Sequence, residues 1–568
     1  MKIAEIETMI SQLLTDSDEV RAVLHVLLNL LAEQYQTIEE QKKEIQELKD
    51  EINLLKGEQK KPEFKAKKKS DISSNGKEKG KDDTDLDDKD QADNDLEERK
   101  KKNKNNKRGN REVAIDREVL LTISKEDLPP DAIIKTTHQV VVQNILFKRD
   151  NVKYTQTVYY SAITGQTYEA PLPTGVSKSC LYGSDLLSFI SILPTLLDVT
   201  QGNLHKLLTN LGLSISTGTL NNLWLKNAEW AIAEQEAILQ AGISTSDYVQ
   251  IDATSNKEAG KSMTTQILTG ALFVVYNTFA TKSRLDVLRA VQGHPQDDIC
   301  LSYNLNTQKL LLHYKISAAD RSNLAQLFCT NQVLSPNDFR KKIAQELPKL
   351  YAKPNIFHKV EDCFALGHYH TQTDFPIIQN LLSDAAPEYN QIAATSHALC
   401  WVHDARYYHK LVPIFDSHKT ALKNFKKSYW AYYDKVLAFK NLSVEQQTIQ
   451  IPLLEAAFDT LFATKTQYEA LDKLIQKTAA NKQQLLVGLY NSAVPLHNNN
   501  AELGARRIVR KRDASLHTMS TTGTRVRDAM LTICQTAAKC GVSIIDYIAD
   551  RIARTYLIKP LAFSVANP

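Results

Sequence analysis

The sequence predicts an α/β protein in which several strands are embedded in a mainly helical chain. Residues 246–254 alternate between polar and apolar side chains, which is typical of a half-buried strand. Residues 262–281 are uncharged but rich in Thr and Asn, so two buried strands fit them better than a membrane-spanning helix. Apolar residues recur at helical spacing through most of the remaining text. With 568 residues, 42% of them hydrophobic, the chain can form two to four domains.

The composition excludes several classes of protein. The net charge of +4 does not by itself indicate a nucleic-acid partner. Seven cysteines without a C-x-x-C pair argue against a disulfide framework and a four-cysteine zinc ribbon, and they fit a reducing cytoplasm. The start, MKIAEIETMI, lacks the pattern of a secretory signal, so we expect a cytoplasmic protein without a membrane anchor.

The first 57 residues predict a coiled coil. Apolar residues recur every seven positions at the two core sites, as Leu24, Leu31, Ile38, Ile45 and Ile52, and as Leu27, Leu48 and Leu55. Ile at the first core position and Leu at the second favour a parallel homodimer. The alternative is that the helix packs in a bundle against another part of the same chain. Residues 58–112, charged in blocks, predict a disordered tether whose last basic block could touch phosphates without sequence preference.

Residues 113–240 predict a small β-rich module followed by helices. VVVQNILF and VKYTQTVYY are rich in β-branched and aromatic residues, which favours strands over 113–178. In 179–240 a helix over Thr200 to Leu211 meets Gly212, and Ser216 can cap a second helix. The spacing is that of a helix-turn-helix, although a helical hairpin that only packs would look the same.

Three carboxylates stand where strands and helices begin or end. Asp252 lies on the alternating strand, on the same face as Gln250 and Thr254. Asp384 follows the apolar run 375–382, and Glu502 falls in the first turn of a helix capped by Asn498, Asn499 and Asn500. Hard divalent cations bind carboxylate oxygens that come from several elements, so the three acids are candidate metal ligands. The alternative is that each is a local feature, because an acid at a strand end more often forms a turn.

The region from about 128 to 552 resembles the IS66-type family of bacterial DDE transposases. The matching text is long and keeps its order: LPPDAIIK, VVVQN, YEAPLPTG, ISTGTLNNL, QIDATS, RLDVLRAVQG, LLSDAAPEYNQ, ALCWVHDARYYHKLVP, LFATKTQYEALDKLI and PLHNNNAELGARRIVRKRDASLHTMSTTGTRVRDAMLTI. The resemblance implies an RNase H-like catalytic core. By position it places the DDE acids on Asp252, Asp384 and Glu502, as ligands of two Mg²⁺ ions for which Mn²⁺ can substitute.

Two features depart from the family pattern. Relatives commonly carry zinc-finger-like cysteines before the helical region, but YYSAITGQTYEAPLP has none, so we expect no zinc there. Helical text over about 292–373 looks like an insertion of unknown role. A second helical insertion, 415–492, separates Asp384 from Glu502. The family implies that this one lies beside the DNA, and a structural lid is the alternative.

The motif Cys400-Trp401-x-His403, with Arg406 after it, resembles a family signature that we interpret as mainly architectural rather than as a zinc site. Trp401 is expected to be buried, with base stacking as the alternative. Arg506 and Arg510 follow Glu502 at helical spacing, which favours phosphate binding along one stripe, although Arg506 could simply pair with Glu502. The full set of predicted DNA contacts is Arg506, Arg507, Arg510, Lys511, Arg512, Arg525, Thr219, Asn221, Asn222 and Lys226.

The function that the resemblance implies is DNA transposition, in which element ends are cut by metal-dependent hydrolysis and their 3′-OH groups are joined to target DNA. The expected partners are terminal repeats, target DNA, a second copy of the chain and accessory proteins. A metal-dependent nuclease without strand transfer, and a DNA-binding regulator with an inactive core, are the alternatives. The expected segments are the coiled coil at 1–57, the tether at 58–112, the β-rich module at 113–178, the helix-turn-helix region at 179–240, the core at 241–414 and 493–555, the insertion at 415–492 and a tail at 556–568.

Overall fold

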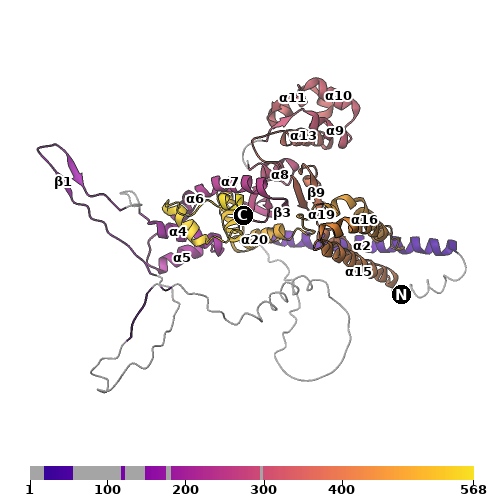
Figure 1. Ribbon diagram of the computed structural model, residues 1–568, viewed down its shortest axis with the longest axis horizontal. Coiled ribbons are helices and arrows are strands. Elements are labelled where there is room, and N and C mark those ends of the chain that lie inside the picture. Colours follow the sequence, from indigo (N-terminus) through magenta and orange to yellow (C-terminus); the bar gives the residue numbers. More distant parts are fainter. Residues whose placement is uncertain are drawn as a thin grey trace, which may run out of the picture. The chain divides into compact units, whose positions relative to one another are not determined.

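The structure is a computed structural model that describes residues 18–55, 115, 117–121, 148–173, 181–293 and 299–567. The chain divides into two units, one made of residues 1–49 and 151–568 and the other of residues 50–150. Almost every element labelled in Figure 1 belongs to the first unit. The predicted tether and the VVVQNILF strand lie outside the described residues.

The first element is a single long helix, α2 (Asp18–Leu55). Its described heptad side chains, such as Leu31, Ile38 and Ile45, are each about half exposed in the single chain. One side chain of α2, that of Asn29, reaches the start of α17 (Glu469–Ala480): its Nδ2 donates to the Gln467 carbonyl, and its Oδ1 accepts from the Glu469 amide at 3.0 Å. The helix that the heptads predict is therefore present, and its apolar stripe faces solvent.

The described part of the predicted β-rich module is one antiparallel hairpin. Strands β1 (Val158–Tyr160) and β2 (Thr167–Glu169) pair from Val158↔Glu169 to Tyr160↔Thr167. All six residues are exposed, so the hairpin has no buried face of its own.

Four described helices lie between the hairpin and the sheet: α4 (Ser184–Leu196), α5 (Gln201–Asn210), α6 (Thr217–Asn227) and α7 (Glu229–Thr245). The local predictions for this stretch are confirmed. Gly212 adopts φ +75° after α5, a backbone conformation that favours glycine, and Ser216 caps α6 by accepting from the Thr219 amide. Apolar side chains of α4, α5 and α6, including Ile190, Leu204 and Leu220, form their own small core.

The centre of the fold is a five-stranded sheet with the order β5-β4-β3-β8-β9. Strands β3 (Val249–Glu258), β4 (Lys261–Thr269) and β5 (Val274–Phe279) are antiparallel neighbours, whereas β8 (Asn380–Ser383) and β9 (Ser396–Leu399) add on in parallel. The α/β prediction is confirmed. The apolar run 375–382 becomes a strand only over its last residues, and a short 3₁₀ turn, η2 (Pro387–Tyr389), follows β8.

Helices from distant parts of the chain cover the sheet. Helix α21 (Thr521–Lys539) lies along β5, where the Thr532 and Thr536 hydroxyls accept hydrogen bonds from the Tyr276 and Val274 amides. Helix α8 (Arg284–Val291) begins after Ser283, whose side chain accepts from the Asp286 amide. The chain ends in α22 (Ile544–Ala553) and α23 (Leu561–Ala566), and α23 packs on α7.

Two helical insertions extend from this sheet. The first holds β6 (Leu301–Ser302), α9 (Leu305–His313), α10 (Ala318–Leu327), β7 (Val333–Leu334), α11 (Pro336–Glu346), α12 (Pro348–Tyr351) and α13 (Pro354–Tyr369). Figure 1 shows α9, α10, α11 and α13 gathered in one group. The second follows α14 (Trp401–His409) and holds α15 (Asp416–Phe439), α16 (Val444–Phe462), α17, α18 (Lys482–Leu485) and α19 (Val487–Tyr490), built around an aromatic core. In the described part of the chain, no helix is long and apolar enough to cross a membrane.

Candidate active site

Asp252 lies in the middle of β3, on the face of the sheet that meets helix α20 (Asn499–Ser515). Side chains alternate along a strand, so Gln250 and Asp252 share one face. The Gln250 side chain contacts the start of α20, because its Oε1 accepts from the Ala501 amide and its Nε2 donates to the His497 carbonyl. Asp252 therefore faces the first turn of that helix, as the alternation in the sequence indicates.

Asp384 follows β8 directly and stands level with Asp252. The parallel register pairs Gln250 with Leu382, so two further residues along both strands lead to Asp252 and Asp384. The Asp384 Oδ1 accepts from the Ala386 amide at 3.1 Å, which turns the chain away from the sheet. The parallel pairing of β3 and β8 thus places the two aspartates side by side on neighbouring strands.

Glu502 joins them from the first turn of α20, the turn that the three asparagines predict. The structure differs in how this helix begins: Asn498 is the N-cap residue, but its side chain makes no cap bond. Its Nδ2 instead donates to the Ile251 carbonyl at 2.8 Å, and Gln250 supplies the bond to the helix amide. Asn498 therefore fastens α20 to β3, and its neighbour Asn499 is the first residue of the helix.

A close approach between α20 and the sheet fixes the position of Glu502. Gly504 is buried, and a Cβ atom there would lie 2.8 Å from the Ile267 Cγ2 atom. The Tyr276 hydroxyl donates to the Gly504 carbonyl at 3.3 Å. Only glycine allows the helix to lie this near to β4, so Gly504 is a site-forming residue that the sequence alone does not reveal.

The three carboxylates influence one another electrostatically. The pKa of Asp252 is raised to about 6, mainly by burial. The negative charges of Asp384 and Glu502 contribute to this rise, whereas the Ala253 amide and Arg406 oppose it. The neighbouring Tyr389 is buried and donates to the Gln266 Oε1 at 3.2 Å. Burial raises its pKa well above the ordinary value, and the charges of Asp384 and Asp252 add to this. Both shifts are due mainly to burial, and the carboxylate charges add to them.

Helix α14 contributes two further side chains to the group. Cys400 is the N-cap residue between β9 and α14, so the C-W-x-H motif lies at a strand-to-helix junction. Arg406 donates to both carboxylate oxygens of Glu502 at 3.1 Å, and the His403 Nε2 lies 3.5 Å from Glu502 Oε1. Burial lowers the pKa of His403, and Arg406 adds to the effect. Both residues act on the third carboxylate.

The donor set suits a hard divalent cation, because it consists of carboxylate oxygens. The described residues donate to only one oxygen of each aspartate, which leaves the second oxygen of each for a ligand role. Among the described residues, however, no three His, Cys, Asp or Glu side chains are arranged to hold a metal ion. The Glu502 carboxylate, which would be the third ligand, is engaged by Arg406.

Trp401 is fully buried, as interpreted from its motif. Its indole Nε1 donates to the Leu485 carbonyl at 2.9 Å, and its ring packs against Tyr429 and Tyr432 of α15. Next to it, the buried Asp404 accepts from the hydroxyls of Thr478 and Tyr429. The insertion thus holds the helix that carries His403 and Arg406, and a base-stacking role for Trp401 is excluded by its burial.

Two of the predicted DNA contacts are engaged inside the protein. Arg507 pairs with Asp198 and donates to the Thr195 carbonyl at 2.7 Å, and Lys511 bonds to the Pro194 carbonyl. Both side chains hold α20 against the end of α4, so they are not among the DNA contacts proposed below. Arg512 donates to Ser255 on β3, and Arg525 is partly buried on α21.

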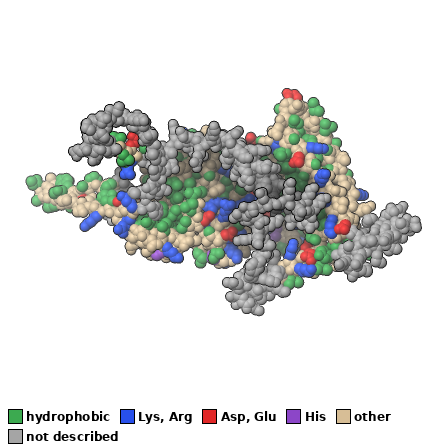
Figure 2. All heavy atoms as spheres, turned by 90° about the horizontal axis from the view of Figure 1, so that it is seen from below, with side chains coloured by type: hydrophobic (Ala, Val, Ile, Leu, Met, Phe, Trp, Pro, Cys, Tyr) green, Lys and Arg blue, Asp and Glu red, His purple; other side chains and the backbone are tan. Residues whose placement is uncertain are grey.

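Arg506 and Arg510 remain on the surface, one and two turns after Glu502, with no ion-pair partner in the described part of the chain. Arg506 therefore does not pair with Glu502, whose partner is Arg406. Figure 2 shows Lys and Arg side chains spread over one face among acidic and hydrophobic ones. The distribution of charge consequently does not mark any one surface of the protein.

Of the four DNA contacts predicted on α6, two are hydrogen-bonded within the protein and two are exposed. The Thr219 hydroxyl bonds to Ser216, and Asn221 accepts from Gln201 at 2.7 Å. Asn222 and Lys226, four residues apart, are exposed on one side of α6. Two of the four side chains are thus available to a ligand.

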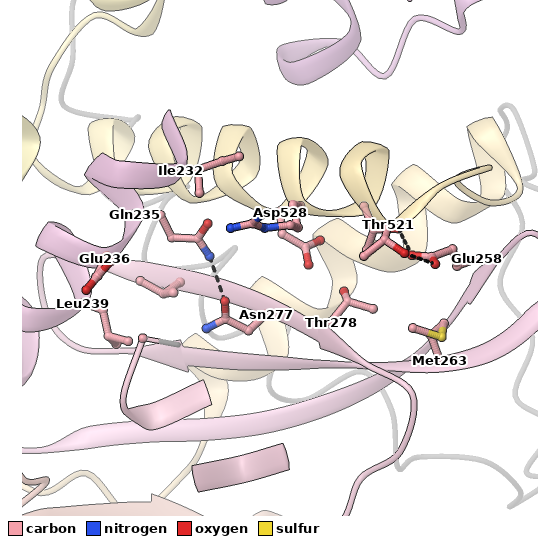
Figure 3. A pocket seen from close by; sticks show the side chains of 14 residues that line it. Ile232, Gln235, Glu236, Leu239, Glu258, Met263, Asn277, Thr278, Thr521 and Asp528 are labelled. Atoms are coloured by element: carbon pink, nitrogen blue, oxygen red, sulfur yellow. Dashed lines mark hydrogen bonds between the residues drawn. The ribbon is translucent and has the colours of Figure 1, made fainter. Parts of the chain in front are cut away.

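A pocket of about 240 Å³ lies elsewhere, between α7, α21 and the β4–β5 side of the sheet. Figure 3 shows its polar lining already paired: Gln235 donates to Asn277 at 3.0 Å, and Thr521 donates to Glu258. Asp528 is paired with Arg527. None of the three carboxylates lines this pocket, so we do not place the chemistry there.

The part of the chain that holds Asp384 and Glu502 matches a known protein family. Residues 375–526 match the family described as Transposase IS66 family. This segment, called the IS66 segment below, is similar to that family. The IS66 segment contains Asp384, Glu502, the C-W-x-H motif and the second helical insertion, whereas Asp252 precedes it.

A curated relative extends the similarity beyond the IS66 segment. The chain is 29% identical over 337 residues to a protein named Uncharacterized protein y4jO, from Sinorhizobium fredii (strain NBRC 101917 / NGR234). The match covers 58% of this chain and 99% of the relative. No solved structure matches.

Proposed function

We propose that the protein is a DDE transposase with an RNase H-like core, which cuts the ends of a mobile element and joins their 3′-OH groups to target DNA. The observation that carries this proposal is the convergence of Asp252 from β3, Asp384 from the end of β8 and Glu502 from α20 at one sheet edge, inside and beside the IS66 segment. The order of the strands, three antiparallel and then two parallel, supports the RNase H-like core.

Asp252, Asp384 and Glu502 would hold two Mg²⁺ ions, which supply activation of the attacking oxygen and stabilisation of the leaving oxygen in an in-line displacement. The protein's own groups position the DNA. Arg506 and Arg510 carry positive charge away from Glu502 along one exposed stripe, suited to successive phosphates. Asn222 and Lys226 on α6 are placed to read element ends, as the helix-turn-helix spacing predicts.

The test of the function is a joining reaction. Full-length protein is incubated with Mg²⁺, a labelled duplex that carries the terminal repeats flanking its gene, and a target plasmid. A transposase gives both nicked ends and joined products. Cleavage without joining would favour the metal-dependent nuclease, and binding without cleavage would favour a DNA-binding regulator.

Arg506→Ala and Arg510→Ala are each expected to weaken DNA binding about equally on cognate and random duplexes. Each should reduce the slope of log K against log salt by about 1, because one phosphate contact releases about one counterion. Binding isotherms at several salt concentrations measure this. The matched control is Arg507→Ala on the same helix, which should lower thermal stability by breaking the pair with Asp198 but leave the slope unchanged. An unchanged slope in both surface variants would refute the phosphate role.

Removal of residues 1–57 is expected to reduce the mass of the assembly to that of a smaller species while the core stays folded. The half-exposed stripe of Leu31, Ile38 and Ile45 motivates this, because a homodimer would bury it. Light scattering measures the mass. A matched full-length variant, Leu31→Glu with Ile38→Glu, keeps the Asn29 contact with α17 and should dissociate as well. An unchanged mass in both would contradict dimerisation through α2.

A further inference from the structure

Helix α14 presents two side chains to the carboxylate of Glu502. His403 and Arg406 are three residues apart, so they share one side of the helix. The Arg406 Nη2 lies 3.1 Å from both Glu502 Oε1 and Glu502 Oε2, and the His403 Nε2 lies 3.5 Å from Oε1. Both oxygens of Glu502 are therefore occupied from within the protein.

The other two carboxylates differ from Glu502 in this respect. The described residues donate a single backbone hydrogen bond to Asp252, from Ala253, and a single one to Asp384, from Ala386. Each aspartate keeps an oxygen free of such bonds. Correspondingly, no three acidic or histidine side chains in the described part of the chain are arranged to hold an ion. Glu502 thus differs from the two aspartates in that both of its oxygens contact Arg406.

We propose that Arg406 is a latch on the third ligand: its ion pair with Glu502 opposes cation binding and must open before Glu502 can join Asp252 and Asp384. This inference rests on the proposed function. It assigns to Arg406 the regulation of cation entry into the site, a role distinct from holding the cation or the substrate.

The exposure of the two partners makes such a latch reversible. The Arg406 side chain is 49% exposed, whereas that of Glu502 is 16% exposed. A guanidinium that is half in water can leave its partner at small cost, since exposed ion pairs are weak. A divalent cation carries twice the charge of the guanidinium in a smaller volume, so it competes effectively for the same oxygens.

A purely supporting role for Arg406 predicts the opposite behaviour. If Arg406 only held Glu502 in the position that a cation requires, its removal would leave the carboxylate disordered and would weaken cation binding. The sign of the change in cation affinity therefore separates a latch from a support.

The experiment is calorimetric titration of the full-length protein with Mn²⁺, without DNA. For Arg406→Gln we expect the dissociation constant to fall about fivefold, the size of a partly exposed ion pair. For Arg406→Lys, which keeps the charge but places it on a more strongly hydrated ammonium, we expect a smaller fall of about twofold. Lys410→Gln is the matched control, because it removes an exposed charge one turn later on α14 without a bond to Glu502.

The outcomes separate cleanly. Tighter Mn²⁺ binding in Arg406→Gln than in Lys410→Gln supports the latch, and unchanged or weaker binding overturns it. Each titration is repeated with Asp252→Asn added, which must remove the binding if the ion lies among the carboxylates. If neither the wild type nor Arg406→Gln binds Mn²⁺ in a manner that Asp252→Asn abolishes, the latch and the proposed metal chemistry both fall. Binding in the wild type that Arg406→Gln leaves unchanged refutes the latch alone.

Discussion

Replacing Asp252 with Asn is expected to reduce Mg²⁺-dependent DNA cleavage at least about a thousandfold, because several kcal/mol of charge stabilisation is lost with one ligand. Asp384→Asn and Glu502→Gln should have effects of the same order, since the three acids act as one unit. Cleavage of a labelled terminal-repeat duplex measures the loss. Asp247→Asn is the matched control, an exposed aspartate just before β3 that should cleave at the wild-type rate. Wild-type rates in the three site variants would refute the assignment.

The folded state provides an independent check on Asp252→Asn. The pKa of Asp252 is raised from 3.8 to about 6, mainly by burial, so the folded protein prefers the protonated acid. The wild type therefore loses stability as the pH rises from about 4 through 6, and the penalty is complete above that range. Asn carries no charge at any pH. We expect the variant to be more stable by about 2 kcal/mol at pH 7.5 and equally stable at pH 4, as measured by chemical denaturation.

Trp401→Ala is expected to give the largest loss of stability, about 3–5 kcal/mol, because it empties a fully buried site and leaves the Leu485 carbonyl without its donor. Chemical denaturation of the full chain measures the loss. Trp430→Ala on α15 is the matched control: its ring is only partly buried, and its removal should cost less than half as much.

The same substitution has a local consequence at the active site. Trp401 begins the helix that carries His403 and Arg406, so loosening it should also alter cleavage by the protein that remains folded. Equal losses of stability for Trp401→Ala and Trp430→Ala would contradict the central position given to Trp401.

Sequence patterns predicted the features that depend on neighbouring residues, such as turns and helix caps. The glycine turn before α6 and the cap at Ser216 follow from local signals. The start of α20 lies close to where the asparagines predict it, but the bonds that fix it come from Gln250 and Ile251 rather than from a cap. The three acids were located in the sequence by the family resemblance, and their spacing alone did not single them out among 66 acidic residues. Their catalytic role stays a prediction.

Contacts between distant segments could not be predicted in this way. The partner of Arg507 is Asp198, more than three hundred residues earlier in the chain. One signal was nevertheless present: Gly504 and Ile508 mark the buried side of α20, and Arg507 and Lys511 lie next to that side at helical spacing. Gln250 could have been found similarly, because it shares a strand face with Asp252. The bond between Asn498 and Ile251 has no comparable sequence pattern.

The order in which the carboxylates occur along the chain has a consequence for synthesis. A ribosome makes β3 first, β8 more than a hundred residues later, and α20 only near the end. The strand pairing that aligns Asp252 with Asp384 must wait for the whole first insertion, and Glu502 arrives after the second. A nascent chain thus carries α2 and α4–α6 long before its third acid exists. Any product that ends before Asn498 would keep those helices but lack Glu502, and by the proposed mechanism it could occupy DNA without cutting it.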